Sequence, residues 1–528
     1  MSSNNNNNTN NNNVSRTPDN IGEDEEDIQI NSETGMSHFL LEEDFSPKET
    51  KILRKYKKIF YLLAAFLTIV TIVLLIVFLL PRGWTPPKKL NVIMMIGDGM
   101  GPAAMTLARV AFNRSLVLDH YLIGTVRTYS FNSTVTDSAA GATAYASCIK
   151  TNNTYVGVDP WDKPAATLME AAKKNGLKTG LVVTTRVSDA TPAAYFSHSH
   201  SRYEEKFIIT QLPDKDVDVV LGGGKKYFTD AIINSMSSNG YSTVYNKTDM
   251  NKVKKGKILG LFADGDIPFE VDRLYDQTSE NIETPSLKEM SQKAIELLNQ
   301  DNSKGFFLML EGSKIDVCGH ANDASGQIYE TQAFDDAFQV ALDFAKKDGH
   351  TIILVTADHE TGGLTLGLQD RIDFYNEYYW NNTLITKVER SSLSMANMII
   401  ASNFTKTREI IQQYAKVEID DSDLALLESL NSTSKYRYLQ RAVGYVISRH
   451  AEIGWTTGGH TGVDVNLYAY APDSLSENTK KEKISPLQDL FGNNNNIDIC
   501  NFIKSKLNLD LESITKTLMS FSPFPPAK

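Results

Sequence analysis

The sequence predicts an α/β fold, in which a doubly wound, mostly parallel sheet carries helices on both faces and one transmembrane helix precedes it. Two observations lead to this prediction. From Leu90 onward, short uninterrupted apolar runs alternate with longer amphipathic stretches, the pattern of strands buried on both faces and of the helices between them. Ahead of them, Ile59 to Leu80 is a run of 22 residues without a charge, long enough to cross a bilayer.

Five apolar runs are expected to form core strands: 90–96, 180–185, 218–223, 305–310 and 351–356. Amphipathic stretches such as SLKEMSQKAIELLNQ and QAFDDAFQVALDFAKK predict helices between them. A further strand is expected in VDVNLYAYAP, near the C-terminus. Residues 371–457 are polar, rich in Tyr and Asn and partly helical, so we interpret them as an insertion over the mouth of the sheet.

The N-terminal region opens with an asparagine tract and an acidic cluster, a composition that cannot repay the entropy of ordering. The expected organisation is a disordered cytoplasmic tail (1–58), a signal anchor (59–80), a Pro-rich stalk (81–90), a folded domain (91–510) containing the insertion, and a C-terminal tail (511–528). Five basic residues precede the apolar run and only three follow it closely, which predicts a single-pass type II topology.

Two further features bear on this topology. The C-terminus, SFSPFPPAK, lacks the apolar tail of a lipid-anchor signal. Glycosylation sequons, which would fit the far side of a membrane, occur at Asn113, Asn132, Asn152, Asn246, Asn381, Asn403 and Asn431.

Charge and cysteine content exclude several classes of protein. The formal net charge of −11 argues against a general nucleic-acid binder, and a phosphate-bearing ligand would need local positive charge. Only three cysteines occur, at Cys148, Cys318 and Cys500, so there is no disulfide framework. The odd count leaves at least one thiol free or paired between chains.

Acidic residues stand at the ends of four predicted strands: Asp98, Asp189, Glu311 and Asp358. In an open α/β sheet, the ligand crevice lies beyond the carboxyl ends of the strands. We therefore expect these side chains to meet. Carboxylates gathered in one crevice repel one another unless a cation lies among them, so the four acids predict a metal site.

Histidines beside acids or glycines complete this pattern. Asp316 and His320 are four residues apart, so one helical turn places both on one face. Asp358 and His359 are adjacent in a turn after a strand, and His460 lies within GGHTGV. Any one of these histidines could be an ordinary loop residue, but together they indicate metal ligands.

The types of donor distinguish two kinds of metal. Histidine and carboxylate together suit zinc, whereas an all-oxygen set such as Asp98, Thr191 and Glu311 suits magnesium. A pair of cations about 4 Å apart can ionise an attacking oxygen and stabilise a leaving one.

A serine that such metals could activate occurs in VTDSAAGAT. Ser138 follows Asp137 and precedes an almost wholly small run, which lets bulky groups approach the backbone. A helix beginning near Ser138 would point its free N–H groups at an anion. The pattern is not the G-x-S-x-G elbow of α/β-hydrolases, so activation by metal is the better interpretation for this serine.

Six motifs now carry a family resemblance: IGDGMG, VTDSAAGAT, SDATPAAYFSHSHSR, EGSKIDVCGHAND, TADHETGG and GGHTG. In this order, over most of 92–472, the sequence resembles the alkaline phosphatase family. With its type II anchor it is most similar to the vacuolar enzymes of fungi and similar eukaryotes. The resemblance implies a broad-specificity phosphomonoesterase on a doubly wound sheet and a homodimer. It implies a lumenal or extracellular domain, in a vacuole or lysosome or at the cell surface.

The resemblance also implies a role for each matched residue. Ser138 would be the nucleophile that forms a phosphoserine, and Arg202 would hold two phosphate oxygens. One zinc ion would be held by Asp316, His320 and His460, and a second by Asp98, Asp358 and His359 beside Ser138. One magnesium ion would be held by Asp98, Thr191 and Glu311, with Asp189 reaching it through water.

Two positions leave the interpretation open. Val317 stands where bacterial relatives often have lysine and animal relatives histidine, which removes a polar contact to phosphate and predicts altered pH dependence or phosphate release. Asp137, a candidate substrate-binding residue, either orients Arg202 or caps a turn.

Two alternative functions remain in view. One is a phosphodiesterase or sulfatase of the same superfamily, although the C-x-P-x-R motif of sulfatases is absent. The other is a catalytically inactive receptor-like ectodomain, against which the intact set of ligands argues. The leading hypothesis is hydrolysis of small phosphate monoesters.

Overall fold

The computed structural model describes residues 46–79, 89–369, 378–478 and 483–520, which divide into two units, 1–85 and 86–528. In the first unit, the helix α1 spans Pro47–Leu79, and its stretch Lys51–Leu75 is long and apolar enough to cross a membrane. The hydroxyls of Thr68 and Thr71 donate to carbonyls one turn earlier, as a lipid-exposed helix requires of polar groups. The helix starts well before the expected anchor; most of the expected tail and stalk lies outside the described residues.

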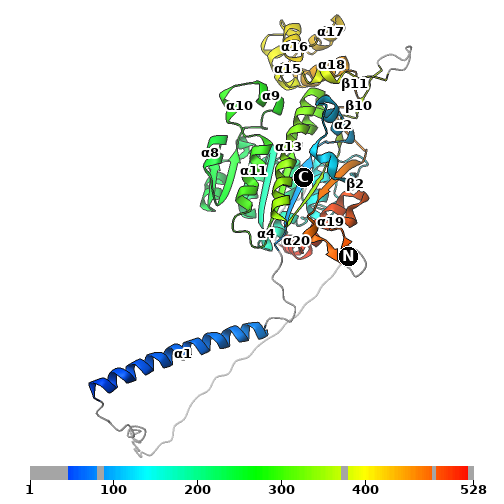
Figure 1. Cartoon of the computed structure of the whole chain (residues 1–528). Helices are drawn as coiled ribbons and strands as arrows, with labels where there is room; N and C mark the ends of the chain where they lie inside the picture. Colours follow the sequence, from blue (N-terminus) through cyan, green and yellow to red (C-terminus); the bar gives the residue numbers. More distant parts are fainter. Residues whose placement is uncertain (1–45, 80–88, 370–377, 479–482, 521–528) are drawn as a thin grey trace, which may run out of the picture. The chain divides into compact units, whose positions relative to one another are not determined.

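A ten-stranded sheet forms the centre of the second unit, in the order β16-β2-β13-β8-β1-β7-β3-β4-β6-β5 (Figure 1). Its strands are β1 (Asn91–Gly97), β2 (Leu122–Arg127), β3 (Lys178–Arg186), β4 (Val219–Gly223), β5 (Tyr241–Val244), β6 (Lys257–Leu261), β7 (Phe306–Gly312), β8 (Thr351–Thr356), β13 (Val465–Tyr470) and β16 (Gly492–Asn495). Only β13 is antiparallel to its neighbours. The predicted doubly wound, mostly parallel sheet is confirmed.

Helices cover both faces of this sheet. The helices of this unit outside the insertion are α2 (Pro102–Ala111), α3 (Ser138–Ser147), α4 (Leu168–Lys174), α5 (Ala190–Phe196), α6 (Glu205–Thr210), α7 (Asp230–Ser238), α8 (Lys247–Lys252), α9 (Glu270–Tyr275), α10 (Ser279–Glu283), α11 (Leu287–Leu298), α12 (Lys314–His320), α13 (Ala324–Asp348), α19 (Asn496–Lys506) and α20 (Leu511–Ser520). The segment expected as a C-terminal tail thus begins with a helix, and Leu511 is buried in the main core.

Adjacent residues of β7 show how the two faces are filled. Phe306 packs against Phe344 of α13, whereas the next residue, Phe307, packs against Tyr195 of α5. Successive side chains of a strand point to opposite faces, so these helices lie on opposite sides of the sheet. Both phenylalanines are fully buried, each contributing roughly 2 kcal/mol of hydrophobic stabilisation.

The expected insertion contains α14 (Asn382–Ile385), α15 (Ser392–Ala401), α16 (Thr407–Ala415), α17 (Asp421–Glu428) and α18 (Tyr436–His450). In Figure 1 these helices, in yellow, gather at one end of the second unit. They enclose a small apolar core of their own, which includes Met395, Ile411 and Val443. Two short ribbons flank the insertion: β10 (Leu364–Leu366) with β11 (Ile453–Trp455), and β9 (Glu360–Thr361) with β12 (His460–Thr461).

Two of the three cysteines form a disulfide bridge, and the third is a free thiol. Cys148, just after α3, is bonded to Cys500 in α19, 352 residues later. Cys318 is free and buried within α12. The bridge therefore ties the C-terminal part of the fold to the helix that begins at Ser138.

Candidate active site

Four acids meet at one edge of the sheet because four neighbouring strands end there. The central strands β8, β1, β7 and β3 run parallel to one another. Asp358 and Asp98 follow β8 and β1, Glu311 is the penultimate residue of β7, and Asp189 is the N-cap of α5 shortly after β3. The predicted gathering of these carboxylates is what the structure shows.

The protein's own groups compensate the negative charge of these carboxylates only in part. Among the described groups, none donates a hydrogen bond to Asp98 Oδ1 or Glu311 Oε2, and both atoms are buried. Burial raises the pKa of Asp98 well above its ordinary value, and repulsion by Asp358 raises it further. Burial and the charge of Asp189 raise the pKa of Glu311 in the same way. A divalent cation would supply the missing positive charge, so the donors fit metal ions.

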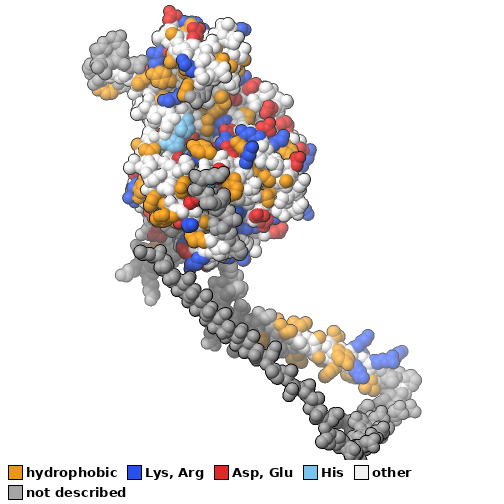
Figure 2. Space-filling model, turned by 180° about the vertical axis from the view of Figure 1, so that it is seen from behind, with side chains coloured by type: hydrophobic (Ala, Val, Ile, Leu, Met, Phe, Trp, Pro, Cys, Tyr) orange, Lys and Arg blue, Asp and Glu red, His pale blue; other side chains and the backbone are white. Residues whose placement is uncertain are grey.

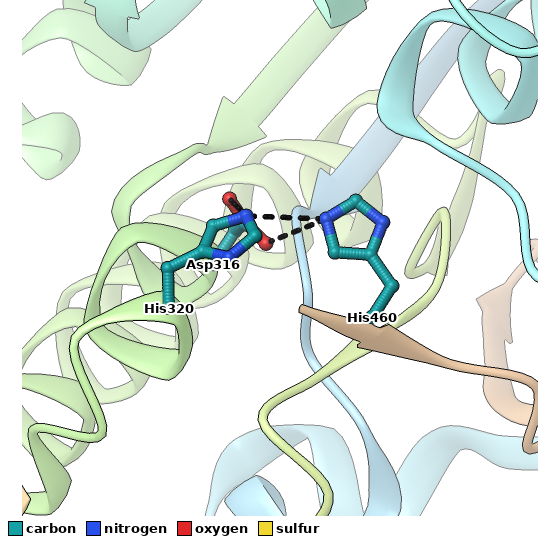
Figure 3. A group of neighbouring side chains, drawn as sticks. All are labelled: Asp316, His320 and His460. Atoms are coloured by element: carbon teal, nitrogen blue, oxygen red, sulfur yellow. Dashed lines mark hydrogen bonds and ion pairs between the residues drawn. The ribbon is translucent and has the colours of Figure 1, made fainter. Parts of the chain in front are cut away.

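Asp316, His320 and His460 form what we term the open ligand group (Figure 3). Asp316 and His320 lie one turn apart on α12, as predicted, and His460 reaches them from β12. His460 Nε2 lies 3.2 Å from His320 Nε2 and 3.6 Å from Asp316 Oδ1. The His320 side chain is 41% exposed, so this group faces solvent.

Backbone carbonyls orient both histidines of the open group. His320 Nδ1 lies 2.7 Å from the Gly458 carbonyl, and His460 Nδ1 lies 2.8 Å from the Thr136 carbonyl. A carbonyl only accepts hydrogen bonds, so each Nδ1 must carry the proton. In the neutral imidazole each Nε2 is then left with a lone pair, the form in which imidazole binds a metal.

Asp98, Asp358 and His359 form what we term the buried ligand group. His359 Nε2 lies 3.0 Å from Asp358 Oδ2 and 3.7 Å from Asp98 Oδ1, and both Asp358 and His359 are fully buried. Pairing of β9 with β12 brings this group beside the open one, with the rings of His359 and His460 stacked 3.5 Å apart. Thr191, at the start of α5, donates to Asp98 Oδ2 at 3.4 Å.

Thr361 links the two groups, and the sequence analysis did not identify it. Its hydroxyl donates to Asp316 Oδ1 at 2.5 Å and lies 3.2 Å from His359 Nδ1. A hydroxyl has one proton, so with that proton on Asp316 it accepts from His359. The contact leaves His359 Nε2 unprotonated, ready for a metal. Only the spacing of two residues from His359 could have indicated this role.

Ser138 lies within the buried group. Its Oγ is 3.1 Å from His359 Nε2, and the side chain is the first of α3. The small residues around it allow close packing, because a Cβ on Gly141 would lie 3.1 Å from that of Asp358. Asp137, rather than Ser138, caps the helix by accepting from the Ala140 amide at 3.0 Å.

Asp137 also contacts Arg202, so it fills both of the roles left open by the sequence. Arg202 donates to Asp137 Oδ2 at 3.2 Å and to Asp189 Oδ1 at 3.4 Å. Burial lowers the pKa of Arg202, but Asp189 and Asp137 outweigh it and the guanidinium stays charged. These bonds hold a cation directly beside the serine helix.

A second arginine, not foreseen from the sequence, pairs with the same carboxylate. Arg186 lies 3.3 Å from Asp189 Oδ1 and also pairs with Glu205 and Asp266. Val317, the departure noted above, is a partly buried apolar side chain packed against the core. The position next to Asp316 therefore brings no charge, while Arg186 supplies one beside Asp189.

A buried serine beside two ligand groups for divalent cations, with an arginine at the serine helix, defines a metal-dependent hydrolase of phosphate esters. Comparison with known proteins makes this specific. The family model described as "Alkaline phosphatase" matches residues 89–509. The chain belongs to the alkaline phosphatase family and is a metal-dependent phosphomonoesterase.

Individual relatives agree with this assignment. The repressible alkaline phosphatase of Saccharomyces cerevisiae is 38% identical over 485 residues, covering 81% of this chain and 83% of that protein. The crystal structure of a cold-active alkaline phosphatase from Shewanella sp. is 33% identical with a TM-score of 0.69, covering 79% of this chain and all of that one. A variant of the TAB5 enzyme, 27% identical with a TM-score of 0.56, covers 80% of this chain and 99% of that one, and has Mg bound in its M3 site.

Proposed function

We propose that Ser138 is the nucleophile of a broad-specificity phosphomonoesterase and carries a phosphoserine during each turnover. The observation that supports this most directly is the 3.1 Å separation between Ser138 Oγ and His359 Nε2, a ligand atom of the buried group. Thr191, at the start of α5, also contacts this group, but its hydroxyl donates to Asp98 Oδ2, whereas the Ser138 hydroxyl lies against His359 Nε2. The matching motif in the alkaline phosphatase family agrees.

The donor sets support two zinc ions and one magnesium ion. The open group and the buried group each combine histidine with carboxylate, which suits zinc. Asp98, Thr191, Glu311 and Asp189 offer oxygen atoms only, which suits magnesium. When bound, such cations would lower the pKa of the serine hydroxyl and of a water molecule, and would neutralise charge on the phosphoryl group. The TAB5 variant with Mg in its M3 site supports the third position.

The protein's own residues then supply positioning. Arg202, released from part of its pairing with Asp137 and Asp189, offers a planar fork that matches two phosphoryl oxygens. The N-terminus of α3 adds its free amide groups beside the same phosphoryl group. Ser138 Oγ attacks phosphorus in line with the leaving alcohol, which departs with a proton. Water then cleaves the phosphoserine, releasing phosphate and restoring the hydroxyl.

The test uses the full chain in detergent with zinc and magnesium. We expect hydrolysis of p-nitrophenyl phosphate, and loss of at least about 1000-fold in kcat for Ser138→Ala. Acid quenching with labelled substrate should leave phosphate on the peptide that contains Ser138 of the wild type only. Ser147→Ala, at the other end of α3, is the matched control. Full activity of Ser138→Ala would overturn the proposal.

The membrane topology is part of this proposal. Basic residues in the first turns of α1, ahead of its apolar stretch, support a cytoplasmic N-terminus, and the Cys148–Cys500 bridge supports an oxidising compartment for the second unit. The sequons at Asn113, Asn132, Asn403 and Asn431 are exposed, so glycans could be attached there. A lumenal or extracellular catalytic unit predicts a mobility shift with endoglycosidase and protection from protease in sealed vesicles. Protease sensitivity of the second unit in those vesicles would reverse the topology.

We propose that two copies of the chain form a homodimer through the edge of the sheet at β16. Exposed apolar side chains lie on or beside β2 and β16, at Leu122, Tyr129, Phe131 and Phe491. Tyr129 also accepts a hydrogen bond from Asn495, which joins this loop to the edge strand. An apolar edge is a typical site of self-association. Light scattering should give twice the mass of the chain, and Leu122→Glu should lower it; a monomeric wild type would contradict the proposal.

A further inference from the structure

One face of α18, within the insertion, contacts the chain segments that flank the open ligand group. Gly444 of α18 packs so closely on the chain just after α12 that a Cβ there would lie 2.3 Å from the Ala321 carbonyl. One turn on, the Ser448 hydroxyl donates to the Asn322 carbonyl at 2.8 Å. Since α12 ends at His320, the insertion is seated directly against the helix that carries two ligands.

Arg441 lies on this same face, one turn before Gly444. Its Nε donates to Asn322 Oδ1 at 2.8 Å. Asn322 is buried, and its amide in turn donates to the carbonyls of Gly319 and Thr457. The guanidinium is therefore held by one edge against a rigid support, which reduces the entropy lost when it binds a ligand.

The guanidinium reaches the edge of the open group. A Cβ on Gly458 would lie 2.4 Å from its Nη1, so the two are in contact, and the Gly458 carbonyl is the acceptor for His320. Arg441 is exposed, and none of the described acidic side chains forms an ion pair with it. Its two terminal nitrogens are thus available to an anion.

The way in which a substrate must enter the site brings its leaving group close to Arg441. The buried group is closed to solvent on the side of Asp358 and His359, whereas His320 is 41% exposed. A phosphoryl group held against Ser138 must leave the rest of its molecule outside, and the open group offers the way out. Figure 2 shows histidine side chains at the surface of the second unit, below the insertion.

Resting on the phosphomonoesterase activity above, we propose that Arg441 binds a second anionic group on the substrate. The chain would then favour phosphate monoesters whose leaving group carries a carboxylate or a further phosphate. Both anions suit a planar guanidinium, which can bind them with two parallel hydrogen bonds. The insertion would thereby set substrate preference within a chemistry performed by the sheet.

The test compares kcat/KM for phosphate monoesters whose leaving groups differ in charge. Glycerol 3-phosphate has an uncharged leaving group, 3-phosphoglycerate adds a carboxylate, and fructose 1,6-bisphosphate adds a phosphate. For Arg441→Gln we expect kcat/KM of the charged substrates to fall about fivefold more than that of glycerol 3-phosphate, chiefly through KM. The difference should shrink in 0.5 M salt. Arg441→Lys should keep part of it, because it keeps the charge without the fork.

The matched control is Arg408→Gln, which removes an exposed arginine from α16 of the same insertion. An unchanged preference in Arg441→Gln would overturn the proposal. So would an equal fall in kcat for all three substrates, because Arg441 would then act only through Gly458 and His320. A response to one anion alone would identify that anion as the ligand. Wild-type chain inactive on glycerol 3-phosphate would instead refute the proposed function itself.

Discussion

The two ligand groups use similar donors but are built differently. In the buried group, Asp358 accepts from the amides of Gly99 and His359, and no solvent reaches either side chain of the adjacent pair. In the open group, two histidines are oriented by carbonyls of separate loops, and one of them is largely accessible. From this difference we expect the two groups to have separate roles: the buried group would serve Ser138, and the open group would serve water and the substrate.

We expect the largest effects on activity from substitutions that remove one ligand from each group. Asp358→Ala should lower kcat/KM by about 1000-fold or more, because no solvent can replace a ligand beside Ser138. His320→Ala should cost only about 10- to 100-fold, because water can occupy the exposed position. Kinetics with p-nitrophenyl phosphate and zinc content measure both. Equal losses would mean that the two groups are not functionally distinct.

Removal of metal should also distinguish the open group from the buried group. A chelator should extract zinc in two phases, the open group first, because its ligands are accessible while the buried group needs local opening of the fold. Zinc content measured over time, alongside activity, checks this. His320→Ala should abolish the fast phase and leave the slow one. A single phase in the wild type would contradict the expected order.

Thr361 tests how independent the groups are. Thr361→Val removes the hydroxyl that contacts Asp316 and His359, so zinc affinity should fall at both groups, by about 10- to 100-fold. Thr361→Ser should restore most of it. Thr179→Val is the control, because that buried hydroxyl has no described partner. Competition with a chromophoric chelator gives the affinities, and weakening of only one group would rule out the link.

The smallest expected effect is on the stability of the metal-free protein. Burial lowers the pKa of His320, but Asp316 raises it to a net value of about 9. Burial and repulsion by His359 lower the pKa of His460 to about 4. The stabilisation from His320 is complete below its unfolded pKa of about 6.5 and is lost as pH rises through 9. That from His460 is present above about 6.5 and lost as pH falls through 4.

Thermal melts of the metal-free chain across pH 4 to 10 measure these opposite slopes. His320→Gln should flatten the alkaline side, and His460→Gln the acidic side. Identical profiles for wild type and both variants would show that the histidines do not set the pH dependence. Zinc should abolish the alkaline slope and strengthen the acidic one, because a ligating histidine cannot take up a proton whereas the same histidine in the unfolded chain can.

The sequence was sufficient where local spacing determines geometry. The one-turn separation of Asp316 and His320 and the acids after consecutive buried strands both led to correct placement, because helix and parallel sheet are regular. It was insufficient where contact depends on chain segments far apart. The pairing of Arg186 with Asp266, the contact of the Thr361 hydroxyl with Asp316 and the antiparallel β13 all depend on tertiary packing, which periodicity does not encode.

Arg441 is another residue whose position the sequence could not indicate. The sequence indicated an insertion over the sheet, but an arginine within a polar helix is normally only a solvated side chain. Its position beside the open ligand group depends on two glycines. Gly444 lets α18 approach the Ala321 carbonyl closely, and Gly458 lets the guanidinium approach the loop that precedes His460. Such a contact can be found only once α18 has been placed.

The bridge from Cys148 to Cys500 has a consequence for biogenesis. The second thiol is made 352 residues after the first, so the clamp on the serine helix cannot close while the intervening strands of the sheet are being synthesised. A growing or truncated chain lacks that clamp, and its maturation waits for an oxidant in the compartment that receives it.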